Sequence, residues 1–219
     1  MTEKTAVEQA LWVAHALFDR GKVAGAAANL SFYVEDKLYI TSGGTCFGTL
    51  TEEDFSVLDA SGSLMRGGVP SKELPLHRIL YEKDAELRAV LHTHSFYTVM
   101  WSMESVPDET DCVPPHTPYL RMRLGTVGLV DDEQPGTPAL FDAFRRVVAH
   151  SDGFILRSHG PVVGGRDIMD AFCRLEELEE SCKVAWYCKY GRMHPPYGHA
   201  SAMHEVFAAK NRQGGSCRS

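Results

Sequence analysis

Short apolar segments recur along this chain between two stretches with helical periodicity, and this alternation limits the folds that the chain can adopt. Residues 5–20 repeat apolar side chains near helical spacing and stop at Gly21, and residues 167–190, rich in Glu and Leu, predict one long helix. The short segments, each typical of a strand, are residues 32–34, 38–41, 56–59, 88–91 and 153–157. This order predicts a layered α/β or α+β domain around one sheet.

Turn and capping signals add detail to this expected fold. The Asp36-Lys37 pair separates two strand segments, which predicts a hairpin. Thr51 precedes three acidic residues, as at the capped start of a short helix, and another helix is expected over residues 70–82. We expect one catalytic domain over residues 1–192 and a C-terminal extension over residues 193–219. A further hypothesis is that residues 197–204 pack over the active-site pocket.

Composition and charge narrow the class of protein. With 219 residues, 44% of them hydrophobic and 23% charged, the chain can bury a sizeable core. The net charge of -7 argues against a broad nucleic-acid surface, although a small phosphorylated substrate remains compatible. The start of the chain lacks a signal-peptide core, and no apolar run approaches the ~18 residues of a membrane span. Six cysteines without a CxxC pair suggest free thiols, so we expect a cytoplasmic protein without membrane or nucleic-acid partners.

The sharpest local signal is His92-Thr93-His94, which follows the apolar segment at residues 88–91. Residues two apart in a strand point to the same face, so both imidazoles can reach one ion. Neutral imidazole suits several divalent transition metals, and such a pair needs one or two further ligands. The alternative for an isolated pair is two surface histidines at the end of a strand.

His159 and Glu73 are the next candidates. His159 follows the segment at residues 153–157 and would complete a three-histidine set with open positions for substrate or water; otherwise it is a lone loop histidine. Glu73 lies near the expected start of a helix, beside Ser71 and Lys72, which could present a hydroxyl and a positive charge to an anion. An acid that complements the helix dipole is the alternative for Glu73.

Two loops could bind an anion. Asn29 and Ser31 follow a run of small side chains, where a ligand could approach the backbone closely. Ser42 and Gly43 offer a similar loop after the next strand segment. Taken singly, each of these loops is also compatible with an ordinary turn.

Five motifs, in this order, resemble the class II aldolase/adducin family, and the resemblance covers residues 5 to about 190. They are Asn29-Leu30-Ser31, Ile40-Thr41-Ser42-Gly43, Pro70-Ser71-Lys72-Glu73-Leu74-Pro75-Leu76-His77, Ala89-Val90-Leu91-His92-Thr93-His94 and Ser158-His159-Gly160-Pro161-Val162-Val163. Each motif alone is weak or moderate, and their combination is specific to the superfamily. The resemblance implies a three-layer α/β/α fold with a central, mainly antiparallel sheet, in a homotetramer with sites at subunit boundaries.

The resemblance also implies a role for each candidate residue. His92, His94 and His159 match the family's metal ligands, and Glu73 matches its catalytic acid/base. The residues that fall where the family binds the substrate phosphate and neighbouring groups are Asn29, Ser42, Gly43, Ser71 and Lys72. Tyr119 lies near the position of a proton-donating tyrosine from an adjacent subunit. The cofactor would be a divalent metal, with zinc expected first and Mn, Co, Ni or Fe as alternatives.

The sequence departs from the family pattern at two positions, and the second of them bears on the branch of the family. Ala28 stands where the family often has a glycine, and Lys72 replaces the second of two serines common in fuculose-phosphate aldolases. The lysine puts a cation where a substrate carboxylate or phosphate could sit. The motif Pro70-Ser71-Lys72-Glu73, together with Thr117-Pro118-Tyr119 and residues 135–140 and 176–180, resembles the 3-oxo-tetronate 4-phosphate decarboxylase branch.

The expected activity is that of a metal-dependent carbon–carbon lyase acting on a small phosphorylated sugar acid or ketose through an enediolate. Decarboxylation of 3-oxo-tetronate 4-phosphate is the first expectation. The alternatives on the same site are fuculose-phosphate-type aldol cleavage, ribulose-phosphate 4-epimerisation, dehydration of a methylthio-sugar phosphate and decarboxylation of an aromatic acid. Outside the enzymes, the alternative is an adducin-like non-catalytic interaction module, which should have lost the metal ligands that this chain retains.

Overall fold

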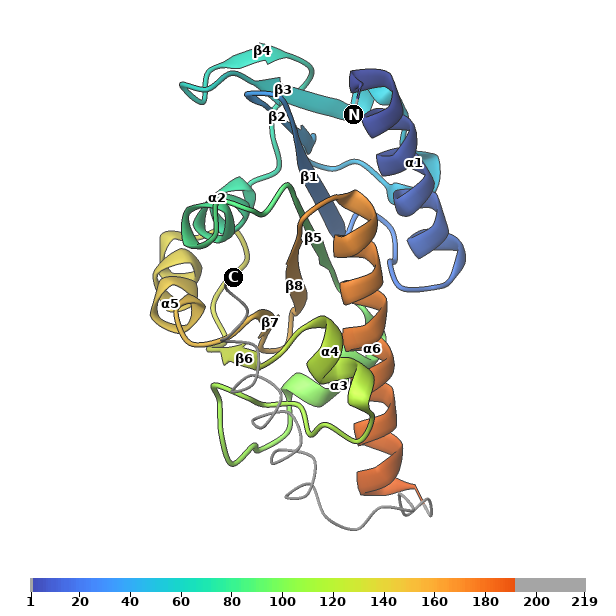
Figure 1. Cartoon of the computed structure of the whole chain (residues 1–219), viewed down its shortest axis with the longest axis vertical. Helices are drawn as coiled ribbons and strands as arrows, with labels where there is room; N and C mark the ends of the chain where they lie inside the picture. Colours follow the sequence, from blue (N-terminus) through green and yellow to red (C-terminus); the bar gives the residue numbers. More distant parts are fainter. Residues whose placement is uncertain (1, 192–219) are drawn as a thin grey trace, which may run out of the picture.

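A computed structural model describes residues 2–191, which form a central eight-stranded sheet covered by helices on both faces (Figure 1). The strands are β1 (Ala28–Val34), β2 (Lys37–Thr41), β3 (Phe55–Leu58), β4 (Leu64–Arg66), β5 (Ala89–Thr93), β6 (Val127–Val130), β7 (Gly153–Leu156) and β8 (Gly160–Gly165). Their order across the sheet is β4-β3-β2-β1-β5-β8-β7-β6. Every neighbouring pair is antiparallel except β6 and β7. The predicted three-layer fold with a mainly antiparallel sheet is therefore confirmed.

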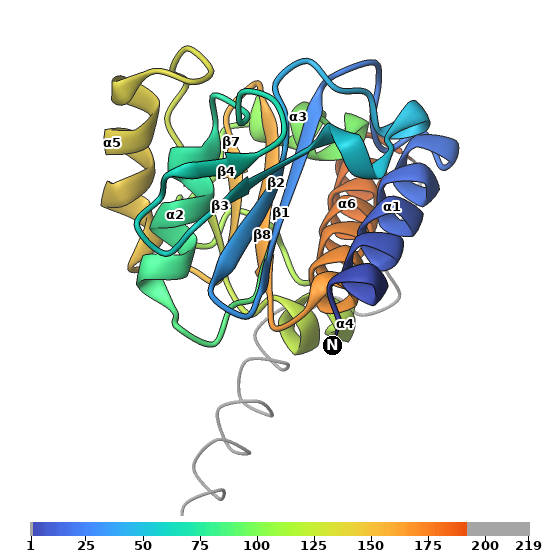
Figure 2. The same cartoon turned by 90° about the horizontal axis from the view of Figure 1, so that it is seen from above.

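The helices form two layers, one on each face of the sheet (Figure 2). One layer is built on α6 (Ile168–Tyr190), against which α1 (Glu3–Asp19), α3 (Phe96–Ser102) and α4 (Pro118–Arg123) pack. The opposite layer contains α2 (Leu74–Lys83) and α5 (Pro138–Val148), which pack on each other. Two short 3-10 helices, η1 (Phe47–Thr49) and η2 (Glu52–Asp54), follow β2. Thr51 and Asp54 form the capping box predicted at the second of them.

Strand β5 lies near the centre of the sheet, and its side chains alternate between the two layers. Ala89 and Leu91 pack in the core on the α6 side, whereas Val90 packs in the core with α2 and α5. Because both faces are covered, residues 89–91 of this strand are apolar without interruption. His92 lies two residues after Val90 and therefore projects toward the α2 layer.

The structure confirms most of the expected elements and moves one boundary. The hairpin of β1 and β2 and the long helix α6 occur as predicted. The helix expected from residue 70 begins only at Leu74. Pro70 pairs with Ser42 in an isolated bridge and the Ser71 N–H donates to the Thr41 carbonyl, so this segment is extended along the end of β2.

Two further expectations concern the C-terminal segment and membrane-spanning helices. The hypothesis that residues 197–204 pack over the pocket lies outside the described residues 2–191. Within that range, no helix has both the length and the apolar character required to cross a membrane.

Candidate functional site

The end of β5 and the turn between β7 and β8 bring the three predicted histidines together. β5 and β8 are antiparallel neighbours, with His92 opposite Val162, so the residue that precedes β8 lies beside the end of β5. The Nε2 atoms of His92 and His159 are 3.2 Å apart. The ring of His94 lies 5.1 Å from that of His92 and 4.5 Å from that of His159, measured between centroids.

The turn that carries His159 requires a glycine at the next position. Gly160 has a φ of +145°, and a Cβ there would lie 2.1 Å from the Thr93 carbonyl oxygen, closer than any real contact. The backbone of this turn thus passes directly against the end of β5. This close approach places His159 within reach of His92.

Glu73 completes the cluster from the opposite side. It is the N-cap residue of α2 and is buried, with only 4% of its surface exposed. Its Oε2 lies 3.3 Å from Nε2 of His92, and its Oε1 lies 3.3 Å from Nε2 of His159. The bridge of Ser42 with Pro70 fixes the segment that leads into α2, and this segment delivers the carboxylate to the histidines.

The environment keeps the imidazoles neutral and ready to act as ligands. Burial lowers the pKa of His92 to about 3, with a smaller contribution from His94. Burial and the adjacent His92 likewise lower the pKa of His159 to about 3, and partial desolvation beside the other two rings lowers the pKa of His94, whose surface remains exposed. The Nδ1 of His92 lies 2.9 Å from the Pro161 carbonyl, to which it can only donate, so the Nε2 lone pair faces the cluster.

The donor set fits a divalent metal. One potential ligand atom from each of His92, His94 and His159 lies within 4.8 Å of the other two. Two nitrogen ligands on a tetrahedral zinc ion lie about 3.3–3.4 Å apart, close to the 3.2 Å between the two Nε2 atoms. Among the described residues, the buried Oε1 of Glu73 and Nδ1 of His159 have no hydrogen-bond partner. The unpartnered Oε1 faces the cluster and suits a site that takes an additional group, whereas Nδ1 of His159 lies on the other side of its ring from the Nε2 atom that faces Glu73.

The predicted substrate-binding residues surround the N-terminus of α2. Asn29 is buried and donates through Nδ2 to Oε2 of Glu73 over 2.8 Å. Ser42 bonds to Ser56, and the backbone N–H of Gly43 donates to Val69. The Ser71 hydroxyl accepts from the Glu73 N–H over 3.3 Å. Lys72 is exposed, and its charge contributes, after burial, to the lowered pKa of His94 and His159.

Two residues do not behave as the sequence suggested. Ser31, grouped with Asn29 as an anion-binding residue, is fully buried and bonds to His77 and Tyr81, so it lies behind the site. His77 is an additional polar member of this region that sequence reasoning missed. The signal available was its position four residues after Glu73, which predicts the same side of a helix.

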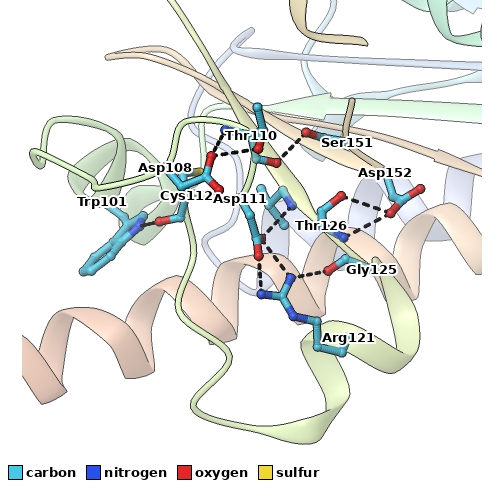
Figure 3. Close-up of polar contacts among 11 residues, drawn as sticks. Trp101, Asp108, Thr110, Asp111, Cys112, Arg121, Gly125, Thr126, Ser151 and Asp152 are labelled. Atoms are coloured by element: carbon cyan, nitrogen blue, oxygen red, sulfur yellow. Dashed lines mark hydrogen bonds and ion pairs between the residues drawn. The ribbon is translucent and has the colours of Figure 1, made fainter. Parts of the chain in front are cut away.

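Tyr119 is separate from the cluster in this single chain. It lies on α4, is 57% exposed, and within residues 2–191 forms no hydrogen bond with the histidines or Glu73. Its helix is anchored by Arg121, which bonds to Asp111 through both nitrogens of its guanidinium fork and to the Gly125 carbonyl (Figure 3). Arg121 therefore has a structural role.

Comparison with known proteins places this geometry in context. A family model for the class II aldolase and adducin N-terminal domain matches residues 8–186. The 3-oxo-tetronate 4-phosphate decarboxylase of Haemophilus influenzae is 35% identical over 84% of this chain and 88% of its own length. The L-fuculose phosphate aldolase of Methanocaldococcus jannaschii is 32% identical over 81% of this chain and 93% of its own.

A solved structure agrees with these sequence relatives. The crystal structure of YgbL from Klebsiella pneumoniae superimposes with a TM-score of 0.86 at 33% sequence identity. The match covers 94% of this chain and 99% of that protein. The similarity therefore extends over the sheet and both helical layers.

Proposed function

The chain belongs to the class II aldolase and adducin family, and from this premise we propose that it is a metal-dependent lyase that decarboxylates 3-oxo-tetronate 4-phosphate. The convergence of three neutral histidines on the buried carboxylate of Glu73 carries the metal-dependent part of this proposal. The choice of reaction is supported by decarboxylases that are 35% identical over more than four-fifths of the chain.

In this proposal His92, His94 and His159 hold a divalent ion. Zinc is our first choice because imidazole nitrogens at this spacing suit tetrahedral coordination, with Mn, Co, Ni or Fe as alternatives. When bound, the ion would supply a Lewis acid that polarises the ketone of the substrate. The Pro161 carbonyl holds the Nδ1 proton of His92, which keeps the other ring nitrogen free to act as a ligand.

The substrate is a β-keto acid, and its chemistry defines what the protein must do. The bond between C1 and C2 breaks, CO₂ leaves from C1, and the electron pair moves toward the C3 carbonyl to give an enediolate. A proton delivered to C2 then yields dihydroxyacetone phosphate. Glu73 is the proposed source or relay of this proton because its carboxylate is buried at the centre of the cluster.

The anionic ends of the substrate require positive or N–H-rich partners. We assign the phosphate and the departing carboxylate to Asn29, Ser42, Gly43, Ser71 and Lys72. Gly43 is exposed and has no side chain, so a ligand can approach its backbone. Lys72 adds the cation that a substrate with two anionic groups requires.

Three broader features belong to the same proposal. The protein would act as a homotetramer in which Tyr119 serves a site in the adjacent subunit, which fits its 57% exposure in the single chain. Residues 1–192 would form the catalytic domain, and residues 193–219 an extension. A cytoplasmic location agrees with the cysteines of the described residues, which are all free thiols.

A fuculose-phosphate-type aldolase is the second candidate, because the aldolase of Methanocaldococcus jannaschii is 32% identical to this chain. Aldol cleavage and 4-epimerisation would use the same histidines and Glu73, and they differ from decarboxylation in the product. An adducin-like interaction module is disfavoured by the intact histidine cluster.

The deciding experiment measures CO₂ release from 3-oxo-tetronate 4-phosphate by the zinc-loaded protein and by its Glu73→Gln variant. The rate without enzyme must be subtracted because β-keto acids lose CO₂ unaided. We expect release that depends on enzyme, metal and Glu73. Release equal to the background would reject the decarboxylase, and ketose phosphates would then be assayed for cleavage or epimerisation.

A further inference from the structure

A continuous chain of buried hydrogen bonds leads away from Glu73 into the interior of the protein. Asn29 Nδ2 lies 2.8 Å from Oε2 of Glu73, and Asn29 Oδ1 lies 2.5 Å from Nε2 of His77. The Nδ1 of His77 lies 2.7 Å from the Ser31 hydroxyl, which in turn lies 2.8 Å from the Tyr81 hydroxyl. We call these five residues the Glu73–Tyr81 chain.

The Glu73–Tyr81 chain brings together segments that are distant in sequence. Asn29 and Ser31 lie two residues apart on β1 and so project to the same face, toward α2. Glu73 is the N-cap residue of α2. His77 and Tyr81 follow at intervals of four residues along the helix, on the side that faces the sheet. The register of one strand against one helix thus produces the whole chain.

Water has little access to these groups. His77 and Ser31 are 0% exposed, and Asn29 is 5% exposed. Burial lowers the pKa of His77 to about 3, and among the described residues no carboxylate contacts its ring. The ring is therefore neutral and carries one N–H, so one of its nitrogens donates and the other accepts.

The carboxylate at one end determines the direction of every bond. An ionised Glu73 only accepts, so Asn29 must turn its Nδ2 toward it and its Oδ1 toward His77. Nε2 of His77 must then donate, and its Nδ1 must accept from the Ser31 hydroxyl. The remaining contact of Ser31 is satisfied when Tyr81 donates to it. All the donors consequently point toward Glu73.

We propose that His77 is a positioning residue for Glu73, acting through the side chain of Asn29. With Ser31 and Tyr81 behind it, the Nε2–H tautomer of His77 fixes the Asn29 amide so that its N–H holds Oε2 of Glu73. Oε1, which has no hydrogen-bond partner among the described residues, is left to carry the proton. The role in catalysis rests on the proposed function, in which Glu73 handles a proton.

The tautomer can be observed without any assay of activity. In zinc-loaded protein labelled with ¹⁵N-histidine, the ring of His77 is expected to show a protonated Nε2 and an unprotonated Nδ1 near neutral pH. Its signals are assigned by their loss in His77→Gln. A protonated Nδ1, or a doubly protonated ring, would overturn the proposed direction of the chain.

A matched pair of variants tests the effect on catalysis. His77→Gln keeps an amide that can donate to Asn29 and accept from Ser31, whereas His77→Met has similar length and neither function. We expect His77→Met to lose about tenfold or more in kcat with KM changed less than about threefold, and His77→Gln to recover most of the loss. Both variants should bind zinc stoichiometrically.

A purely structural role predicts a different result. If folded His77→Gln and His77→Met both bind zinc and lose kcat equally, His77 is a packing residue and the proposal is wrong. Should His77→Met fail to fold, Ser31→Ala is the substitute, since it removes the donor to Nδ1, and an unchanged kcat would overturn the proposal. Wild-type protein with the expected tautomer but no lyase activity would reject the proposed function alone.

Discussion

At the residue scale, the three clustered histidines differ in how much of the structure depends on them. His92 and His159 are buried, whereas His94 is exposed just beyond the end of β5. An exposed side chain can be removed without leaving a cavity, so metal binding and folding can be separated at this position. His94 is therefore the residue to use for testing the metal site.

The His94→Ala variant is expected to lose its metal while it remains folded. Without His94 only two imidazoles are left to hold the ion, and affinity should fall by orders of magnitude. The measurement is metal content after dialysis, together with the free energy of unfolding in chelator, which should change by less than about 0.5 kcal/mol. His116→Ala removes another exposed histidine as the control. Stoichiometric metal in His94→Ala would reject the three-histidine site.

Because His77 is buried, we expect it to make the free energy of unfolding depend on pH. Its pKa is lowered by burial to about 3 in the folded protein, against about 6.5 when unfolded. The contribution of neutral His77 to the free energy of unfolding is thus fully present above about pH 6.5. It is lost as the pH falls from there toward 3, because only the unfolded chain takes up the proton. From about pH 7 to pH 5, wild type should lose about 2 kcal/mol more than His77→Gln. Urea denaturation in chelator measures this, and equal losses would contradict a buried neutral His77.

At the element scale, the turn between β7 and β8 has the strictest requirement for its sequence. Gly160→Ala would force a Cβ to within 2.1 Å of the Thr93 carbonyl in a left-handed backbone conformation. We expect a loss of roughly 2–4 kcal/mol in unfolding free energy, with weaker metal binding because His159 is adjacent. Gly25→Ala also has a positive φ but meets nothing within 4 Å, so it should lose only about 1 kcal/mol. If Gly160→Ala and Gly25→Ala lowered the free energy of unfolding equally, in thermal or urea unfolding, the turn between β7 and β8 would be able to shift and accommodate the Cβ.

A second element-scale prediction concerns α4. Arg121 and Asp111 form a largely buried ion pair that fixes this helix to the preceding loop, as Figure 3 shows. Asp111→Asn should lower the unfolding free energy by about 1–3 kcal/mol, because the guanidinium is left without its charged partner. Asp142→Asn disrupts an exposed pair with Arg145 and should have little effect. Urea denaturation compares the two, and similar midpoints would argue against an anchoring role.

The elements that could be predicted from sequence are those with a clear period or turn signal. The hairpin, β5, β7 and α6 follow from apolar runs and from the Glu- and Leu-rich repeat. β8 could not be found in this way, because its Gly and Pro residues argue against a central strand. The structure gives the reason: a Cβ on Gly160 would collide with Thr93, and one on Gly165 would collide with Ala171 of α6.

The candidate site was predictable in its composition but not in its connections. The HxH pair and His159 were identified because residue type and position at a strand end indicate metal binding, and Glu73 because it lies near a helix start within a family motif. The bond from Asn29 to Glu73, and the one from His77 to Asn29, depend on how α2 lies against β1. That packing is a tertiary property with no local signature, although the four-residue spacing from Glu73 to His77 was available.

At the scale of the whole molecule, the surface of the single chain bears several large apolar side chains. Val69 is 79% exposed. On α4, Met122 is 63% exposed and Tyr119 is 57% exposed. In the proposed homotetramer, such side chains would be the ones to bury between subunits. A homotetramer of 24.3 kDa chains should give about 97 kDa by light scattering. A monomer at assay concentration would contradict both the tetramer and the service of Tyr119 to a neighbouring site.

The candidate site is assembled from four segments of the chain, and this has a consequence for the order of events during synthesis. Asn29 lies on β1, Glu73 at the N-cap of α2, His92 on β5 and His159 in the turn before β8. His159 reaches the others only when β8 pairs with β5. Until β8 has emerged from the ribosome, the nascent chain has no complete binding site. In the proposed metal-dependent enzyme, the ion would therefore be loaded late, after β8 has paired with β5.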